Sequence, residues 1–166
     1  PDVRSRSYTI EAHVEIGEEG AEGVLIAHGD ATSGYSLYIK DGVLVHDLNI
    51  GGGHEIVTSN RKVPSGAHRP GVHVERLLRK EPPAKGSRTG VTAYTLLIDG
   101  EAAGSIQTQS AFNNFISWSG LDIGRDRSSP VSHYEAPFEF TGQLLRVTVD
   151  MHDDQKLDGE GVGAAE

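Results

Sequence analysis

The segment Tyr35-Ser-Leu-Tyr-Ile-Lys-Asp-Gly-Val-Leu-Val-His-Asp-Leu48 decides the fold class. Apolar and polar residues alternate on both sides of Asp41-Gly42, a dipeptide suited to a type I′ turn, in which both central residues have positive φ. The same arrangement returns at residues 94–98, Asp99-Gly100 and residues 101–104. Two such hairpins predict an antiparallel sheet.

Further strands are predicted on both sides of these hairpins. Residues 8–16 alternate between an apolar and a polar face, and Val24-Leu-Ile-Ala27 is an apolar run typical of a central strand. Residues 54–58, 73–78 and 144–149 also have strand character. About ten short strands in one domain must curl or split into two packed sheets. We therefore expect an all-β fold, a two-sheet antiparallel β-sandwich of the jelly-roll or concanavalin A-like class.

Composition sets limits on the function. The absence of cysteine excludes disulfides, thiolate metal sites and cysteine nucleophiles. The net charge of −9 disfavours nucleic acid, whose phosphates are bound by lysine and arginine. No apolar stretch has the roughly 18 residues that a membrane span needs. The compartment, cytoplasmic or secreted, is not resolved by the sequence.

Length and composition also predict the domain organisation. We expect a β-sandwich domain over residues 1–151 and a disordered acidic C-terminal tail over residues 152–166, which carries too few apolar residues to form a core. Residues 79–90, with two prolines and four basic residues, read as an exposed loop between strands. The beginning at Pro1 suggests a segment of a longer polypeptide, with a processed N-terminus as the alternative.

Catalytic motifs are largely missing. The sequence contains no GxxxxGK[ST], GxGxxG, GxSxG or HExxH pattern. Glu135 and Glu139 form a candidate carboxylate pair for a glycosidase, but Pro137 separates them. Glu11, His13 and Glu15 share the polar face of one strand, which a solvated surface explains. We expect that this chain is not an enzyme by itself.

Metal ligands and an aromatic platform are the remaining candidates. His46-Asp47 and His54-Glu55 lie on successive strands and could approach each other, although surface or partly satisfied histidines are the expected outcome. Asp122 and Asp126 are calcium candidates; the alternative is that Asp126 caps its own turn. Trp118 is the best candidate for a stacking face that binds carbohydrate, but a lone tryptophan in a small sandwich is expected in the core.

A charged loop between two core strands is the predicted binding or interface region. Its candidate residues, taken together with Trp118, are Asp122, Arg125, Asp126, Ser129, His133 and Tyr134.

The order of several short motifs resembles the C-terminal lectin-like β-sandwich domain of bacterial arylsulfatases. The motifs extend from about residue 8 to residue 150, which is most of the chain. They include Gly23-Val-Leu-Ile-Ala-His-Gly29, Gly34-Tyr-Ser-Leu-Tyr-Ile-Lys-Asp-Gly42, Val63-Pro-Ser-Gly-Ala-His68, Asp99-Gly100, Leu121-Asp-Ile-Gly-Arg-Asp126, Ser129-Pro-Val-Ser132, Phe140-Thr-Gly142 and Val147-Thr-Val149. Ser128 replaces a favoured glycine and His46 replaces an aromatic residue, and the basic loop 79–90 is longer than usual.

This resemblance implies a partner domain rather than a reaction. The C/S-x-P-x-R motif from which sulfatases make formylglycine is absent. The implied function is a non-catalytic accessory domain of an arylsulfatase-like sulfuric ester hydrolase, packed against a catalytic domain outside this chain. The alternative is a free-standing, lectin-like carbohydrate-binding module. Apart from the calcium candidates, no cofactor is implied.

Overall fold

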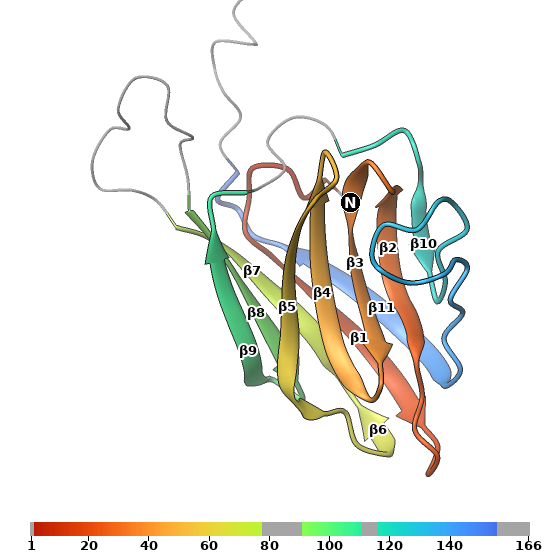
Figure 1. The fold of residues 1–166 in the computed structure, drawn as a ribbon. Coiled ribbons are helices and arrows are strands. Elements are labelled where there is room, and N and C mark those ends of the chain that lie inside the picture. Colours follow the sequence, from red (N-terminus) through yellow and green to blue (C-terminus); the bar gives the residue numbers. More distant parts are fainter. Residues whose placement is uncertain (1, 78–90, 111–115, 156–166) are drawn as a thin grey trace, which may run out of the picture.

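The computed structural model describes residues 2–77, 91–110 and 116–155. Figure 1 shows two β-sheets packed face to face, with no helix among the described residues. The strands are β1 (Tyr8–Ile16), β2 (Gly23–Asp30), β3 (Ser33–Lys40), β4 (Val43–Ile50), β5 (Gly53–Lys62), β6 (Gly66–His68), β7 (Pro70–Leu77), β8 (Val91–Ile98), β9 (Glu101–Thr108), β10 (Leu121–Ile123) and β11 (Gln143–Met151). The predicted all-β sandwich is confirmed.

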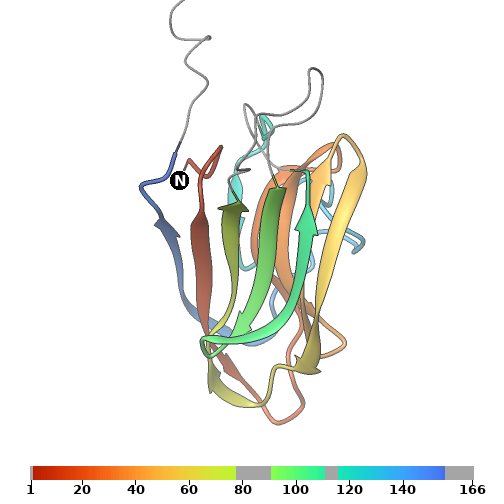
Figure 2. The ribbon, with the colours of Figure 1, turned by 90° about the vertical axis from the view of Figure 1, so that its left-hand side faces the viewer.

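Every pair of neighbouring strands in the two sheets is antiparallel. One sheet has the order β11-β1-β7-β8-β9, with the short β6 also paired to β1, and the other has the order β10-β2-β3-β4-β5. Figure 2 shows the six-stranded sheet from β11 (blue) across to β9 (green). A hydrogen bond of 2.8 Å from Thr108 Oγ1 to Glu55 joins the two sheets where the edge strands β9 and β5 meet.

The two predicted hairpins have the expected turn conformation. Asp41 and Gly42 have φ of 53° and 80°, and Asp99 and Gly100 have φ of 55° and 82°. Positive φ at both central positions matches the right-handed twist of the flanking strands. These turns fix the register of β3 with β4 and of β8 with β9.

The inner faces of the two sheets form the main core. Alternate residues of β1 from Tyr8 to Ile16 point into it and are buried, as the alternation predicts.

The burial of the side chain at position 46, in β4, differs from the prediction. His46 is fully buried and its ring stacks on Tyr35 and Tyr94, at centroid distances of 6.5 and 5.1 Å. The expectation of a surface or partly satisfied histidine is wrong here, because His46 alternates with the core residues Leu44 and Leu48.

A second, smaller core covers the outer face of the five-stranded sheet. Residues 124–142, which we call the outer loop, lie across this face (Figure 1). Val131 and Tyr134 of the loop pack there against side chains of the sheet, which are Val24, Ala27, Tyr38 and Val45. Strand β2 is therefore buried on both faces, which explains its unbroken apolar run.

The two ends of the described chain lie against each other. Asp154 accepts hydrogen bonds from the amide and the hydroxyl of Ser7, at 2.8 and 2.5 Å, and the Gln155 side chain donates to the carbonyl of Arg4. The first residues of the segment that we predicted as a disordered tail are thus hydrogen-bonded to the N-terminal segment. Residues 156–166 and the basic loop lie outside the described residues. The described part of the chain contains no helix long and apolar enough to cross a membrane.

Candidate functional site

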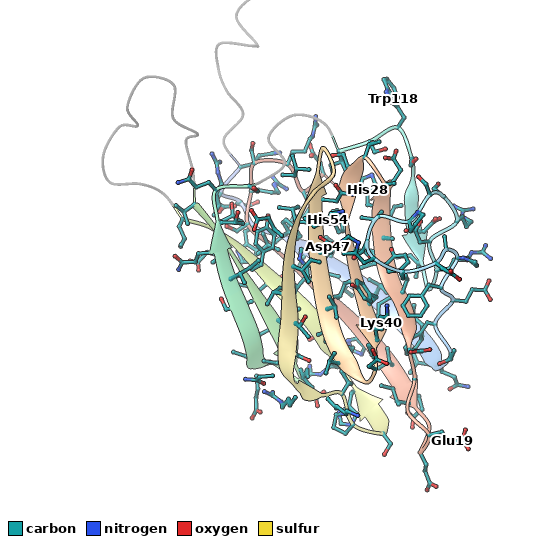
Figure 3. The ribbon with its side chains drawn as sticks, viewed as in Figure 1. Glu19, His28, Lys40, Asp47, His54 and Trp118 are labelled. Atoms are coloured by element: carbon teal, nitrogen blue, oxygen red, sulfur yellow. The ribbon has the colours of Figure 1, made fainter. Side chains whose placement is uncertain are left out.

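Trp118 lies on the surface at one end of the sandwich, where its side chain points away from the sheets (Figure 3). It is 95% exposed, so the expectation that it belongs to the core is wrong. The core anchor of this segment is its neighbour Ile116, which is buried among the inner residues. In a strand, Ile116 and Trp118 would point to the same side and both would be buried. Residues 116–120 form a loop instead, so Ile116 is buried while Trp118 is exposed.

The segment that carries Trp118 is held on both sides by one carboxylate. Ser117 and Ser119 both donate their hydroxyls to Oδ2 of Asp30, the latter at 3.1 Å, and Asp30 ends strand β2. The amide of Ser119 also donates to Ser117 Oγ, and the amide of Gly29 donates to the carbonyl of Gly120. These bonds fix the backbone under Trp118 while leaving the indole outside.

We call this region the upper rim and define it as residues 30–33, 116–120 and 126–130. Within it, Asp30 also accepts hydrogen bonds from the amide and the hydroxyl of Thr32, at 2.8 and 2.5 Å. The bonds from Ser117 and then from Thr32 hold the pKa of the Asp30 carboxyl well below its usual range. The rim therefore carries a fixed negative charge directly beneath the Trp118 segment.

Asp126 organises the outer loop from within. Its carboxylate accepts hydrogen bonds from the amides of Ser128 and Val131 and, at 2.7 Å, from the hydroxyl of Tyr134. Burial, together with the nearby Asp126 charge, raises the pKa of the Tyr134 phenol well above its usual value. Asp126 thus caps its own turn, the alternative to a calcium ligand. Among the residues that the structure describes, no three or more His, Asp or Glu side chains are arranged to hold a metal ion.

Arg125 of the predicted site and the neighbouring Arg127, which was not among the predicted residues, both face carboxylates. Arg127 donates its Nε to Asp122 at 2.6 Å, and its Nη2 lies 2.5 Å from the same oxygen. Partial burial of Asp122 opposes ionisation, but its hydrogen bonds with Arg127 outweigh this and lower the pKa of the carboxyl. Arg125 lies 3.7 Å from Glu139, one of the two carboxylates considered for a glycosidase.

His133 and Ser129 lie on opposite sides of the outer loop. Ser129 Oγ accepts a hydrogen bond from the amide of Ala31, which ties the loop to the β2–β3 turn. His133 instead stacks on His54 of β5, with ring centroids 4.3 Å apart. The seven predicted residues are therefore not gathered in one place. Trp118, Asp126 and Ser129 belong to the upper rim, whereas the Tyr134 side chain is buried between the outer loop and the sheet, and His133 contacts β5.

The predicted approach of the β4 and β5 polar residues is found. His54 Nδ1 lies 2.7 Å from Oδ2 of Asp47, a fully buried residue, and Ser132 donates its hydroxyl to the same oxygen at 2.5 Å. Lys40 also donates to the carbonyl of His133. Figure 3 shows Lys40, Asp47 and His54 below Trp118, on the face that the outer loop crosses. This cluster fastens the loop to the sheet.

A cavity of about 850 Å³ lies at the other end of the molecule from Trp118, near Glu19 (Figure 3). Its lining is rich in carboxylates, from Glu18, Glu19, Glu22 and Asp41, with Lys62 as the basic residue. Neither Glu135 nor Glu139 lines it, so this cavity does not provide the glycosidase hypothesis with a cleft.

No protein-family model matches the sequence, and no curated protein sequence matches it. Solved structures do match its fold. Domains LG4-5 of the mouse laminin alpha1 chain match with a TM-score of 0.62 at 16% identity, over 95% of this chain and 38% of that chain. The CBM40 of Ruminococcus gnavus IT-sialidase bound to α2,3-sialyllactose matches with a TM-score of 0.59 at 14% identity, over 97% and 83%. This chain has a lectin-like β-sandwich fold.

The lectin-like β-sandwich spans little more than a third of the laminin chain that it matches, but most of the CBM40. The same CBM40 bound to α2,6-sialyllactose gives a TM-score of 0.58 at 13% identity. At such identities the likeness shows the fold and not a shared binding site. These comparisons link the chain to no arylsulfatase, so the resemblance seen in the sequence gains support for its fold and none for its family.

Proposed function

We propose that this chain is a non-catalytic, carbohydrate-binding module and that Trp118 is its stacking surface. The observation that carries the proposal is the indole itself, 95% exposed on a segment that two serines bind to Asp30. A rigidly presented aromatic ring offers a large contact area at little entropic cost, which is why tryptophan is common at binding hot spots.

The neighbours in fold space support this choice over an accessory domain of a sulfatase. The CBM40 structures were solved with bound sialyllactose, so this sandwich fold accommodates glycan-binding sites. An accessory domain would instead carry one apolar interface. The large apolar side chains exposed among the described residues come from four separate elements, and they are Ile56, Trp118, Ile123, Leu145 and Met151. No observation singles out one of these elements as an interface.

The test replaces Trp118 by alanine and measures saccharide binding by isothermal titration calorimetry against a panel of neutral and acidic oligosaccharides. We expect Trp118→Ala to weaken binding by about thirtyfold or more, the loss typical of a hot-spot residue. The unfolding midpoint should stay unchanged, because the side chain is outside the core.

Leu145→Ala is the matched control, since Leu145 is a large apolar residue that is 67% exposed on β11. It should bind as tightly as the wild type. Equal losses in the two variants, or binding that survives Trp118→Ala, would show that the indole is not the stacking surface.

A further inference from the structure

The charges of the upper rim restrict the kind of saccharide that Trp118 can receive. The rim carries two aspartates, Asp30 and Asp126, against one arginine, Arg127. Asp30 is hydrogen-bonded to both residues that flank Trp118, so its carboxylate lies next to the segment that carries the indole. A carboxylate on a sugar that stacks on Trp118 would therefore meet a like charge, and such contacts are repulsive.

The rim also lacks a free cation to offset this charge. Proteins typically recognise a carboxylate through two parallel hydrogen bonds from one arginine guanidinium, a bidentate contact. The guanidinium of Arg127 already donates to Asp122 through Nε and Nη2. Arg125, just outside the rim, lies 3.7 Å from Glu139. Each arginine of this region thus has a carboxylate partner from the chain itself.

Hydroxyl groups make up most of the remaining polar side chains of the rim. They belong to Thr32, Ser33, Ser117, Ser119, Ser128 and Ser129. The hydroxyls of Thr32, Ser117 and Ser119 already donate to Asp30, so these three present acceptor oxygens to a ligand. A hydroxyl both donates and accepts hydrogen bonds, as the hydroxyls of a sugar do. The rim therefore offers an aromatic face and neutral hydrogen-bonding groups, which fit the two surfaces of an uncharged pyranose.

We propose that the upper rim selects uncharged saccharides and discriminates against sugars that carry a carboxylate. This inference rests on the proposed function, because it names the ligand class of the same site. It separates this chain from the CBM40 structures, whose bound ligand is sialylated.

The experiment compares a neutral panel (lactose, cellobiose, maltotriose and xylotriose) with an acidic panel (3′-sialyllactose and trigalacturonate) on the full chain. Binding is followed by calorimetry and by the emission of Trp118, the one tryptophan of the sequence. We expect at least one neutral saccharide to bind in a Trp118-dependent manner, and each acidic probe to bind about tenfold more weakly or not at all. Raising the salt concentration should narrow this gap, because salt screens the repulsion at an exposed site.

A variant with one carboxylate fewer tests whether charge repulsion causes the weaker binding of acidic saccharides. Asp122→Asn removes one carboxylate and frees Arg127, while the amide oxygen can still accept the hydrogen bond from the Arg127 backbone. We expect affinity for 3′-sialyllactose to rise by about threefold or more, with neutral binding unchanged. Asp41→Asn is the control, because it changes the net charge equally at the cavity end and should have no such effect.

The outcomes separate the two proposals. If an acidic probe binds as tightly as the best neutral saccharide and loses binding in Trp118→Ala, the inference about ligand class is overturned and the proposed function stands. If no saccharide of either panel binds in a Trp118-dependent manner, the proposed function fails and the inference fails with it. If Asp122→Asn does not fold, the salt titration of the wild type still decides whether repulsion sets the preference.

Discussion

At the scale of single residues, His46 is a polar side chain that is fully buried in the core. It is stacked between two tyrosine rings, and the described residues provide neither of its ring nitrogens with a hydrogen-bond partner. Burial lowers the pKa of His46 to about 3. The imidazole therefore acts as an aromatic spacer at the cost of two unsatisfied polar atoms.

Stability should depend on pH through this residue. In the unfolded chain His46 has its ordinary pKa of 6.5, so between pH 6.5 and 3 the unfolded state binds the extra proton. Neutral His46 therefore makes its full contribution to the free energy of unfolding above pH 6.5. As the pH falls from 6.5 toward 3, the free energy of unfolding decreases by up to about 1.4 kcal/mol per pH unit. Replacing His46 by phenylalanine should raise the free energy of unfolding by about 1 kcal/mol near pH 7 and flatten this slope. Urea melts at a series of pH values measure both, and an unchanged slope would contradict the assignment.

At the scale of elements, the outer loop is held by buried polar groups rather than by regular hydrogen bonding. Inside the loop, Asp126 accepts hydrogen bonds from two backbone amides and from the hydroxyl of Tyr134. Asp47 of the sheet accepts a hydrogen bond from the hydroxyl of Ser132. Hydrogen bonds to a buried carboxylate are stronger than those between neutral groups. The loop therefore covers the outer face of the sheet with a defined conformation, and Ser129 ties it to the β2–β3 turn by accepting a hydrogen bond from the amide of Ala31.

Removing this central carboxylate should weaken the whole element. Asp126→Ala leaves buried donors without a partner and should lower the free energy of unfolding by about 2–3 kcal/mol, measured by urea denaturation. Glu135→Ala, an exposed residue of the same loop, should have little effect. Calcium should leave the unfolding midpoint of the wild type unchanged. A stabilisation by calcium that disappears in Asp126→Ala would instead identify this carboxylate as a metal ligand.

At the scale of the whole molecule, the two-sheet sandwich follows from local signals in the sequence. The Asp-Gly turns and the alternation of β1 depend only on residues that are close in the sequence, so they can be predicted without knowledge of the fold. The burial of His46 was also readable, since Leu44 and Leu48 share its face. The site was not, because its contacts join distant residues: Ser117 and Asp30 are 87 positions apart, and Ser132 and Asp47 are 85 apart.

The exposure of Trp118 likewise depends on the fold, because a tryptophan between two serines suits a loop and a strand equally. Since Trp118 is the one tryptophan of the sequence, its emission reports on this question alone. In the folded chain we expect a spectrum and an acrylamide quenching constant close to those of a solvated indole. Urea unfolding, followed in parallel by far-ultraviolet circular dichroism, should then change the β-sheet signal cooperatively while the emission maximum hardly moves. A blue-shifted native spectrum that moves to the red together with the dichroism would place the indole in the core and remove the surface on which the proposed function depends.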